Sequence, residues 1–218
     1  MMETTCHRVV AIDGPAASGK SSVARELARR LDFIYVNSGA IYRAITWYIL
    51  RQGIQASDST RVAQIVGAAA IDCQLENKEA RVLIHRADPT PHLREPGVND
   101  AVSEVSAVPA VRHIVTEKIR AYAREYDLVV EGRDIGSVVF PDTPFKFYID
   151  ASPLVRFQRR AAQGQRDEIA ARDRVDSSRH AAPLTIAPNA HVIDSSEVSI
   201  TEVVDQIVRR LQEINFSG

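Results

Sequence analysis

A lysine and a serine near the start of the sequence follow two glycines in the spacing Gly14-x-x-x-x-Gly19-Lys20-Ser21. Glycines at these places allow a tight turn, in which successive backbone N–H groups converge on an anion beside the positive end of the next helix. The Lys20 ammonium would reach the β and γ phosphates of a nucleotide, and the Ser21 hydroxyl would contact Mg²⁺. The pattern therefore predicts a phosphate loop whose ATP-binding residues are Gly14, Pro15, Ala16, Ala17, Ser18, Gly19, Lys20, Ser21 and Ser22.

The segments on either side of this loop have the patterns that such a loop needs. The apolar run Val9-Val10-Ala11-Ile12 is short enough for a buried parallel strand, and an amphipathic helix is predicted from Val23 to about Leu31. The alternative is a glycine-rich turn that joins a strand to a helix and binds nothing. The complete eight-residue pattern between a strand and a helix favours nucleotide binding.

The rest of the chain continues the alternation of strands and helices, which predicts an α/β fold. We expect a P-loop NTPase-type parallel sheet of five strands with helices on both faces. The further strands are expected at Phe33–Val36, Leu128–Val130, Phe145–Ile149 and His191–Asp194. The helices are expected from Ser38, as N-cap, to about Gln52, from Asp58 to about Ala70, over Val98–Ser106 and Pro109–Glu125, from Ser152-Pro153, and from Ser199 to about Asn215.

One region interrupts this alternation. Ile71–Leu75 and Ala80–Ile84 alternate between apolar and polar residues and are separated by four polar residues, which predicts a β-hairpin. A hairpin inside an alternating chain indicates an inserted lobe. We therefore expect a single P-loop chain over residues 1–218, with a core at about 8–55, 107–155 and 185–216, an inserted lobe at about 56–106 and a lid at about 156–184.

Charged clusters follow the predicted strands at their carboxyl ends. In a parallel sheet, ligands bind outside these ends, so Ser38–Arg43 and Glu131–Asp134 should share one cleft with the phosphate loop. The sequence between Arg156 and Arg179 is rich in arginine. Such a stretch is either a solvated helical face or a lid that surrounds the transferred phosphate with positive charge. Beside a phosphate loop the lid is the better interpretation for Arg156, Arg159, Arg160, Arg166, Arg172, Arg174 and Arg179.

The composition is that of a soluble globular protein, with 45% hydrophobic and 25% charged residues in 218. A net charge of −1 argues against a general role on nucleic acid or on membrane surfaces. No stretch reads as a secretory leader or a membrane span. Two cysteines, Cys6 and Cys73, make no disulfide framework and fit the reducing cytoplasm. We expect a cytoplasmic protein, monomeric by default, that acts on small molecules.

Four segments together closely resemble the bacterial cytidylate kinase family, over about Val9 to Leu211. The phosphate loop alone is shared by many nucleotide-binding proteins, whereas the block Gly132-Arg133-Asp134-Ile135-Gly136 with the later arginines and aspartate is far more specific. The segments are Asp13–Ser22, Asn37-Ser38-Gly39-Ala40-Ile41-Tyr42-Arg43, Glu131–Asp142, and Arg172-Asp173-x-x-Asp176-x-x-Arg179 followed by Ala182-Pro183-Leu184.

The resemblance implies transfer of the γ-phosphoryl group of ATP, with Mg²⁺, to CMP or dCMP, giving ADP and CDP or dCDP in pyrimidine nucleotide metabolism. It makes the inserted lobe the acceptor-binding lobe and Lys20, Arg133, Arg179 and Arg159 the catalytic residues. It further implies that Arg43, Arg133 and Arg179 hold the acceptor phosphate, that Ser103, Arg112 and Asp134 read cytosine, that Asp176 holds the ribose with Arg172 nearby, and that Ser38 and Tyr42 line the acceptor site.

Alternatives remain for single residues and for the whole chain. Glu131 holds Mg²⁺ through water or forms an internal salt bridge, and Arg133 and Asp134 alone could be an ion pair that closes a strand end. Without the resemblance, Ser103 and Arg112 would be ordinary surface residues. A kinase for another nucleoside monophosphate or for shikimate is the enzyme alternative, and an ATP-dependent switch or a non-catalytic ATP-binding module is the alternative from a different class.

Overall fold

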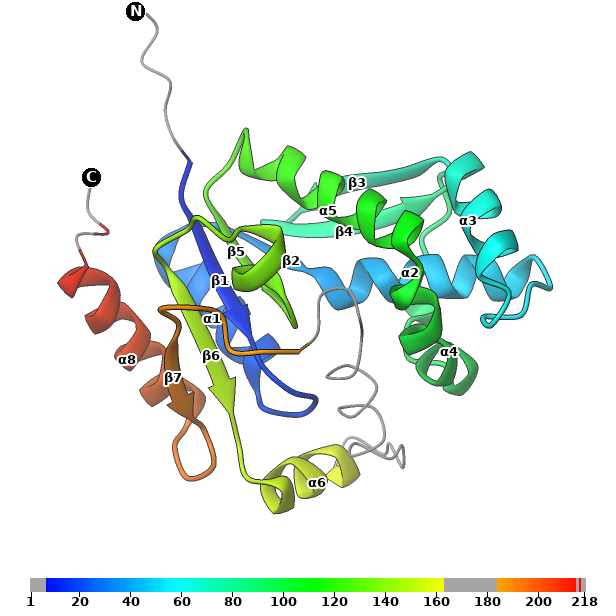
Figure 1. Cartoon of the computed structure of the whole chain (residues 1–218). Coiled ribbons are helices and arrows are strands. Elements are labelled where there is room, and N and C mark those ends of the chain that lie inside the picture. Colours follow the sequence, from blue (N-terminus) through cyan, green and yellow to red (C-terminus); the bar gives the residue numbers. More distant parts are fainter. Residues whose placement is uncertain (1–6, 163–183, 215, 217–218) are drawn as a thin grey trace, which may run out of the picture. The chain divides into compact units, whose positions relative to one another are not determined.

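The computed structural model describes residues 7–162, 184–214 and 216 and divides into two compact units. The first unit comprises Met1–Tyr35 and Ala123–Gly218, and the second comprises Val36–Tyr122. Figure 1 shows the elements of both units in the colours of the sequence. The chain therefore passes from the first unit into the second and back again.

The first unit is built on parallel strands. Strand β1 (Val9–Asp13) pairs in parallel with β5 (Leu128–Gly132) and with β6 (Lys146–Asp150), and β6 pairs in parallel with β7 (His191–Asp194). All residues of β1 and β5 are buried, as expected for apolar strands covered on both faces. Their carboxyl ends coincide, because Asp13 is the register partner of Gly132.

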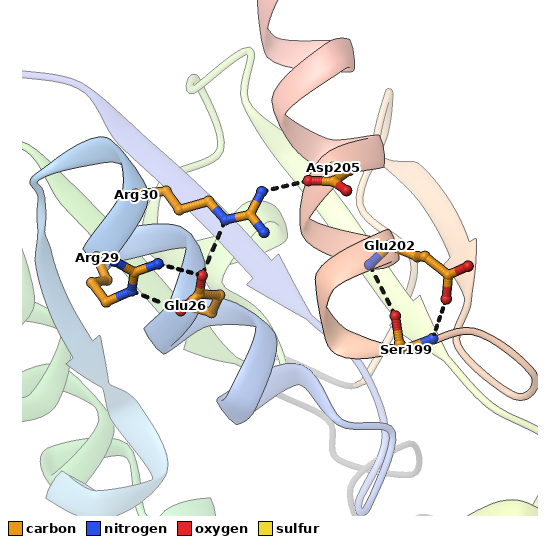
Figure 2. A network of polar contacts seen from close by, with 6 residues as sticks. All are labelled: Glu26, Arg29, Arg30, Ser199, Glu202 and Asp205. Atoms are coloured by element: carbon orange, nitrogen blue, oxygen red, sulfur yellow. Dashed lines mark hydrogen bonds and ion pairs between the residues drawn. The ribbon is translucent and has the colours of Figure 1, made fainter.

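In the described part of this unit, the α-helices are α1 (Lys20–Leu31), α6 (Pro153–Ala162) and α8 (Ile200–Glu213). Apolar residues of α1 and α8 enter one core with those of β1, β5 and β6. Figure 2 shows polar contacts of the same helices. Arg30 of α1 bonds Glu26 on its own helix and Asp205 on α8. A capping box of Ser199 and Glu202 starts α8, in agreement with its predicted beginning.

The second unit contains most of the helices and the hairpin. Its elements are α2 (Ser38–Arg51), α3 (Ser59–Ala68), β3 (Ile71–Glu76), β4 (Glu79–Ile84), the 3₁₀ turn η1 (Thr90–His92), α4 (Pro96–Ala107) and α5 (Pro109–Ala123). Helix α2 contacts α3, α4 and β4. The predicted hairpin is confirmed as an antiparallel pair, joined at Asn77 and Lys78. Both residues have positive φ, at 51° and 61°, as a type I′ turn requires.

An aromatic pair joins α2 to η1 in this unit. The rings of Trp47 and His92 stack, with their centroids 5.3 Å apart and their planes at 14°. The guanidinium of Arg51 lies over the indole at 5.5 Å, and His92 Nδ1 lies 2.6 Å from Glu95 Oε1. Trp47 is the only tryptophan in the sequence.

The structure differs from the sequence prediction in three details. Strand β2 (Ile34–Asn37) is shared by the units, and the hydrogen-bonded order β3-β4-β2-β5-β1-β6-β7 counts seven strands where five were expected, because the hairpin strands join the order. Asn37 instead of Ser38 is the N-cap of α2, since its side chain accepts from Ala40 N at 2.8 Å. A single turn of π-helix, η2 (Ile135–Val139), follows β5 and was not predicted.

Candidate active site

The phosphate loop lies between β1 and α1. Its first residue must be glycine, because another strand approaches it closely. A Cβ atom at Gly14 would lie 2.1 Å from the carbonyl oxygen of Ile149, so no larger residue fits there. Gly19 ends the loop with a left-handed φ of 88° and is the N-cap of α1, without a side-chain cap. A helix that begins without a side-chain cap presents its first N–H groups to an anion.

Lys20 is the first residue of α1 and is 8% exposed. Its Nζ donates to the carbonyl oxygen of Pro15 at 3.0 Å, which holds the ammonium against the loop. A cation in this place can balance the charge of phosphates that the backbone amides bind. The predicted role of Lys20 requires such a position beside the loop.

Ser21 and Glu131 lie together although 110 residues separate them. Ser21 Oγ donates to Glu131 Oε2 at 2.8 Å, and the hydroxyl of Tyr35 donates to Glu131 Oε1 at 2.7 Å. Glu131 is 2% exposed, and the Arg25 guanidinium lies over the Tyr35 ring at 4.8 Å. Tyr35, which orients this carboxylate, was not among the predicted site residues.

The oxygens of Ser21 and Glu131 fit Mg²⁺, a hard cation that prefers hydroxyl, carboxylate and water oxygens. Within the residues that the structure describes, no group of three or more His, Cys, Asp or Glu side chains could hold a metal alone. Mg²⁺ usually keeps several waters and is bound through one or two protein oxygens together with substrate phosphates.

Arg133 and Asp134 follow β5 and lie at the phosphate loop. Arg133 Nη1 donates to the Gly14 carbonyl oxygen at 2.9 Å, and Asp134 is 4% exposed. The next two backbone N–H groups, of Ile135 and Gly136, donate to the two carboxylate oxygens of Asp13, each at 2.8 Å. The structure thus places the Gly132–Gly136 block directly beside the phosphate loop, as the topology predicted for Arg133 and Asp134.

Burial raises the pKa of Asp13 from 3.8 to about 6. The two backbone N–H bonds and the charge of Lys20 oppose this rise, and the nearby charge of Asp134 adds to it. Because the pKa is higher in the folded protein, the folded state binds the proton more tightly. The stability from that proton is present below pH 3.8 and is lost as the pH rises through about 6.

We therefore expect the free energy of unfolding to fall between about pH 4 and pH 6 by on the order of 3 kcal/mol through Asp13. The Asp13→Asn variant should lack this part of the pH dependence. Urea unfolding of both proteins across this range measures it. A difference between the two proteins that is independent of pH would contradict the assignment.

Arg156 and Arg159 of α6 bond carbonyl oxygens of the phosphate loop. Arg156 Nη1 donates to Ala16 O at 3.4 Å, and Arg159 Nη1 donates to Ser18 O at 3.3 Å. The buried Ser195 hydroxyl lies 2.7 Å from Ser18 O and accepts from Arg159 Nη1 at 3.0 Å. Ser195, the residue that follows β7 and bonds the loop, was not among the predicted site residues.

The second unit brings together several residues assigned to the acceptor. The guanidinium of Arg112 lies over the Tyr42 ring at 5.7 Å and donates to Ser106 O at 3.4 Å, and Ser106 Oγ donates to Ser103 O at 3.1 Å. Ser38 is buried and begins α2, one turn before Tyr42.

Arg43 lies over the first turn of the same helix. A Cβ atom at Gly39 would be 3.0 Å from Arg43 Nη1, so a larger residue there would require the end of the Arg43 side chain to shift slightly. Arg172, Asp176 and Arg179, the remaining predicted acceptor residues, lie outside the described residues.

Comparisons with known proteins give one family. A model of the family described as "Cytidylate kinase" matches residues 10–213. A curated cytidylate kinase of Pelotomaculum thermopropionicum is 40% identical over 214 residues, which cover 93% of this chain and 95% of the relative. One of Corynebacterium efficiens is 41% identical over 213 residues, covering 92% and 93%.

Among solved structures, TT1252 from Thermus thermophilus matches with a TM-score of 0.50 at 16% identity, over 96% of this chain and 98% of that chain. This likeness concerns the fold alone. In the part of the chain that the structure describes, no helix has the length and apolarity needed to cross a membrane.

Proposed function

Because this chain belongs to the cytidylate kinase family, we infer that it transfers the γ-phosphoryl group of ATP to CMP or dCMP, giving ADP and CDP or dCDP. The observation that supports this most directly is the bond from Arg133 to the Gly14 carbonyl oxygen. It joins the family's specific block to the phosphate loop. Neither a kinase for another acceptor nor a switch that only binds ATP is favoured beside this family match.

On the donor side, the loop amides and the Lys20 ammonium bind the β and γ phosphates and hold the γ-phosphorus in line with the acceptor. Ser21 and Glu131 would hold Mg²⁺, which would supply positive charge to offset that of the ATP phosphates. Arg159, whose Nη1 donates to Ser18 O at 3.3 Å, is proposed as a catalytic residue beside the loop. We propose the remaining basic residues of about 156–184 as the lid.

On the acceptor side, a phosphate oxygen of CMP attacks the γ-phosphorus as the bond to the β-phosphate oxygen breaks, and ADP leaves. Arg43, Arg133 and Arg179 neutralise the acceptor phosphate, whose oxygen is already a nucleophile, so no general base is needed. Ser103, Arg112 and Asp134 offer donors and an acceptor complementary to cytosine. Asp176 binds the ribose beside Arg172, and Ser38 and Tyr42 line the site.

We also propose a monomer that works in the cytoplasm on small molecules and binds neither nucleic acid nor membrane. The net charge of −1 and the cysteine content support this assignment. Sedimentation at several protein concentrations tests the monomer.

The test of the function is ADP formation from Mg·ATP with CMP, dCMP, UMP, AMP, GMP and shikimate offered separately. Turnover confined to the cytidine nucleotides is expected. Strong turnover with AMP, GMP or shikimate would show that the enzyme acts on a different acceptor. ATP binding without turnover on any acceptor would leave an ATP-binding module.

Asp134→Ala should weaken CMP binding much more than ATP binding. Its carboxylate is assigned to the base, and its loss leaves buried polar groups unpaired at a cost of about 1 to 3 kcal/mol, or roughly fivefold to 150-fold in affinity. Calorimetric titration with each nucleotide measures both constants. Equal weakening of the two nucleotides would contradict the assignment to base reading.

A further inference from the structure

We propose that Asp13 is a positioning residue for the acceptor, because its carboxylate fastens the turn that carries Arg133 and Asp134 to the end of strand β1. The resemblance and the comparisons assign it no such role. The proposal rests on the proposed function, since it takes Arg133 and Asp134 as residues that bind the acceptor.

The contacts of Asp13 all lie within the first unit. Its two carboxylate oxygens accept from Ile135 N and Gly136 N, each at 2.8 Å, and the residue is 2% exposed. Arg133 Nη1 meanwhile reaches the carbonyl oxygen of the next residue, Gly14, at 2.9 Å. The turn is therefore tied on both sides of Asp134 to two consecutive residues at the start of the phosphate loop.

The turn needs such an external partner. It is followed by the single π-helical turn η2, and the first N–H groups of any helix have no partner within it. An element of five residues is too short to be stable alone. A carboxylate at its amino end supplies both the missing acceptors and the favourable charge.

Asp134 would be the ordinary residue to perform this capping. It occupies the N-cap position of η2, where an aspartate side chain normally accepts from the helix amides, yet its side chain makes no capping bond. Asp13 caps the turn from the neighbouring strand in its place.

Burying the charged carboxylate of Asp13 costs free energy, which a contact that only supports the structure would not require. Burial raises its pKa to about 6, and the negative charge of Asp134 acts in the same direction. In the structure, however, each of the two adjacent N–H donors bonds a different carboxylate oxygen, and a carboxylate is the side chain that offers two such oxygens. Asparagine has nearly the same shape but would direct an NH₂ group at one of the two donors.

Asp13→Asn is therefore the sharpest substitution, tested in the full chain by steady-state kinetics with each substrate varied in turn. We expect the KM for CMP to rise by about tenfold, as for a buried donor left unpaired, while the KM for ATP changes by less than about threefold. Equal increases for both nucleotides, or no increase for CMP, would overturn the proposal.

Asp127→Asn is the matched control. Asp127 also accepts a backbone N–H, that of Arg8 at 2.6 Å, just before β5 and so at the opposite end of the β1–β5 pair. Its loss should lower the melting temperature and leave both KM values unchanged. A rise of the CMP KM in this control as large as in Asp13→Asn would make the effect one of general stability and overturn the proposal.

Amide hydrogen exchange of the unmodified protein gives a second measurement, which holds even if Asp13→Asn fails to fold. The Ile135 and Gly136 amides should exchange far more slowly than exposed loop amides. Exchange at loop rates would overturn the proposal.

Asp134→Ala in parallel separates the two levels of inference. A selective loss of CMP affinity there with none in Asp13→Asn overturns the positioning role alone. No selective loss in Asp134→Ala overturns the assignment of the base reader, and the positioning role falls with it.

Discussion

Replacing Lys20 with alanine is expected to lower kcat by roughly a hundredfold to a thousandfold while the protein stays folded. The ammonium is held against the phosphate loop by the Pro15 carbonyl oxygen, 3.0 Å away, where charge moves during phosphoryl transfer. The side chain packs at the start of α1, outside the main core cluster, so its loss removes little apolar burial. Single-turnover kinetics and a thermal melt of the same sample measure the two quantities.

Lys146 offers a matched control for this prediction. It is also a buried lysine, and its Nζ also donates to a proline carbonyl five residues earlier, Pro141 O at 2.5 Å. Methionine at either position keeps the length of the stem and removes the charge. Lys20→Met should lose activity and Lys146→Met should keep it. Near-normal turnover of a folded Lys20 variant would disprove the catalytic role.

Replacing Arg133 with alanine is expected to cost on the order of a thousandfold in kcat/KM for CMP, if its guanidinium neutralises charge in the transition state as arginines do in other phosphoryl transfers. The structure places this guanidinium at Gly14 O, within the loop that we propose to bind the donor phosphates. The same loss is predicted for Arg179→Ala, although that residue lies outside the described part of the chain.

The size of the loss decides between chemistry and binding. Arg133→Lys keeps the charge without the two-pronged fork and should recover only part of the activity. Arg29→Ala removes an exposed arginine that bonds Glu26 on the same unit, and it should leave kcat/KM unchanged (Figure 2). A loss of tenfold or less for Arg133→Ala would mean that the residue only binds the substrate or only supports the structure.

Local patterns predicted the elements of the fold well, and the exceptions have local causes. The apolar runs became β1 and β5, and the hairpin appeared where alternation indicated it. The N-cap of α2 lies one residue before the predicted one. Asn37 and Ser38 are both good N-cap residues, and in the structure the side chain of Asn37 accepts the bond from Ala40 N. The π turn η2 was missed because the partner of its first two backbone N–H groups is the side chain of Asp13 on a distant strand, which side-chain periodicity does not reveal.

The candidate site divides in the same way. The phosphate loop could be predicted because all of its residues are contiguous. Glu131 could be linked to Ser21 only through the order of strands, and Arg133 to the loop through the same step. Asp13 and Ser195 were missed because their main partners are backbone groups of distant segments, which leave no trace in the types of neighbouring residues.

The position of Trp47, which stacks on His92 in the second unit, makes it possible to follow the unfolding of the two units separately. Since Trp47 is the only tryptophan and lies in the second unit, intrinsic tryptophan emission follows the unfolding of that unit alone, whereas far-ultraviolet circular dichroism follows the helices of both. Coincident transitions by the two probes would mean that the units unfold as one cooperative body. Separated transitions would mean that the unit carrying Ser38, Tyr42 and Arg43 melts independently of the phosphate loop.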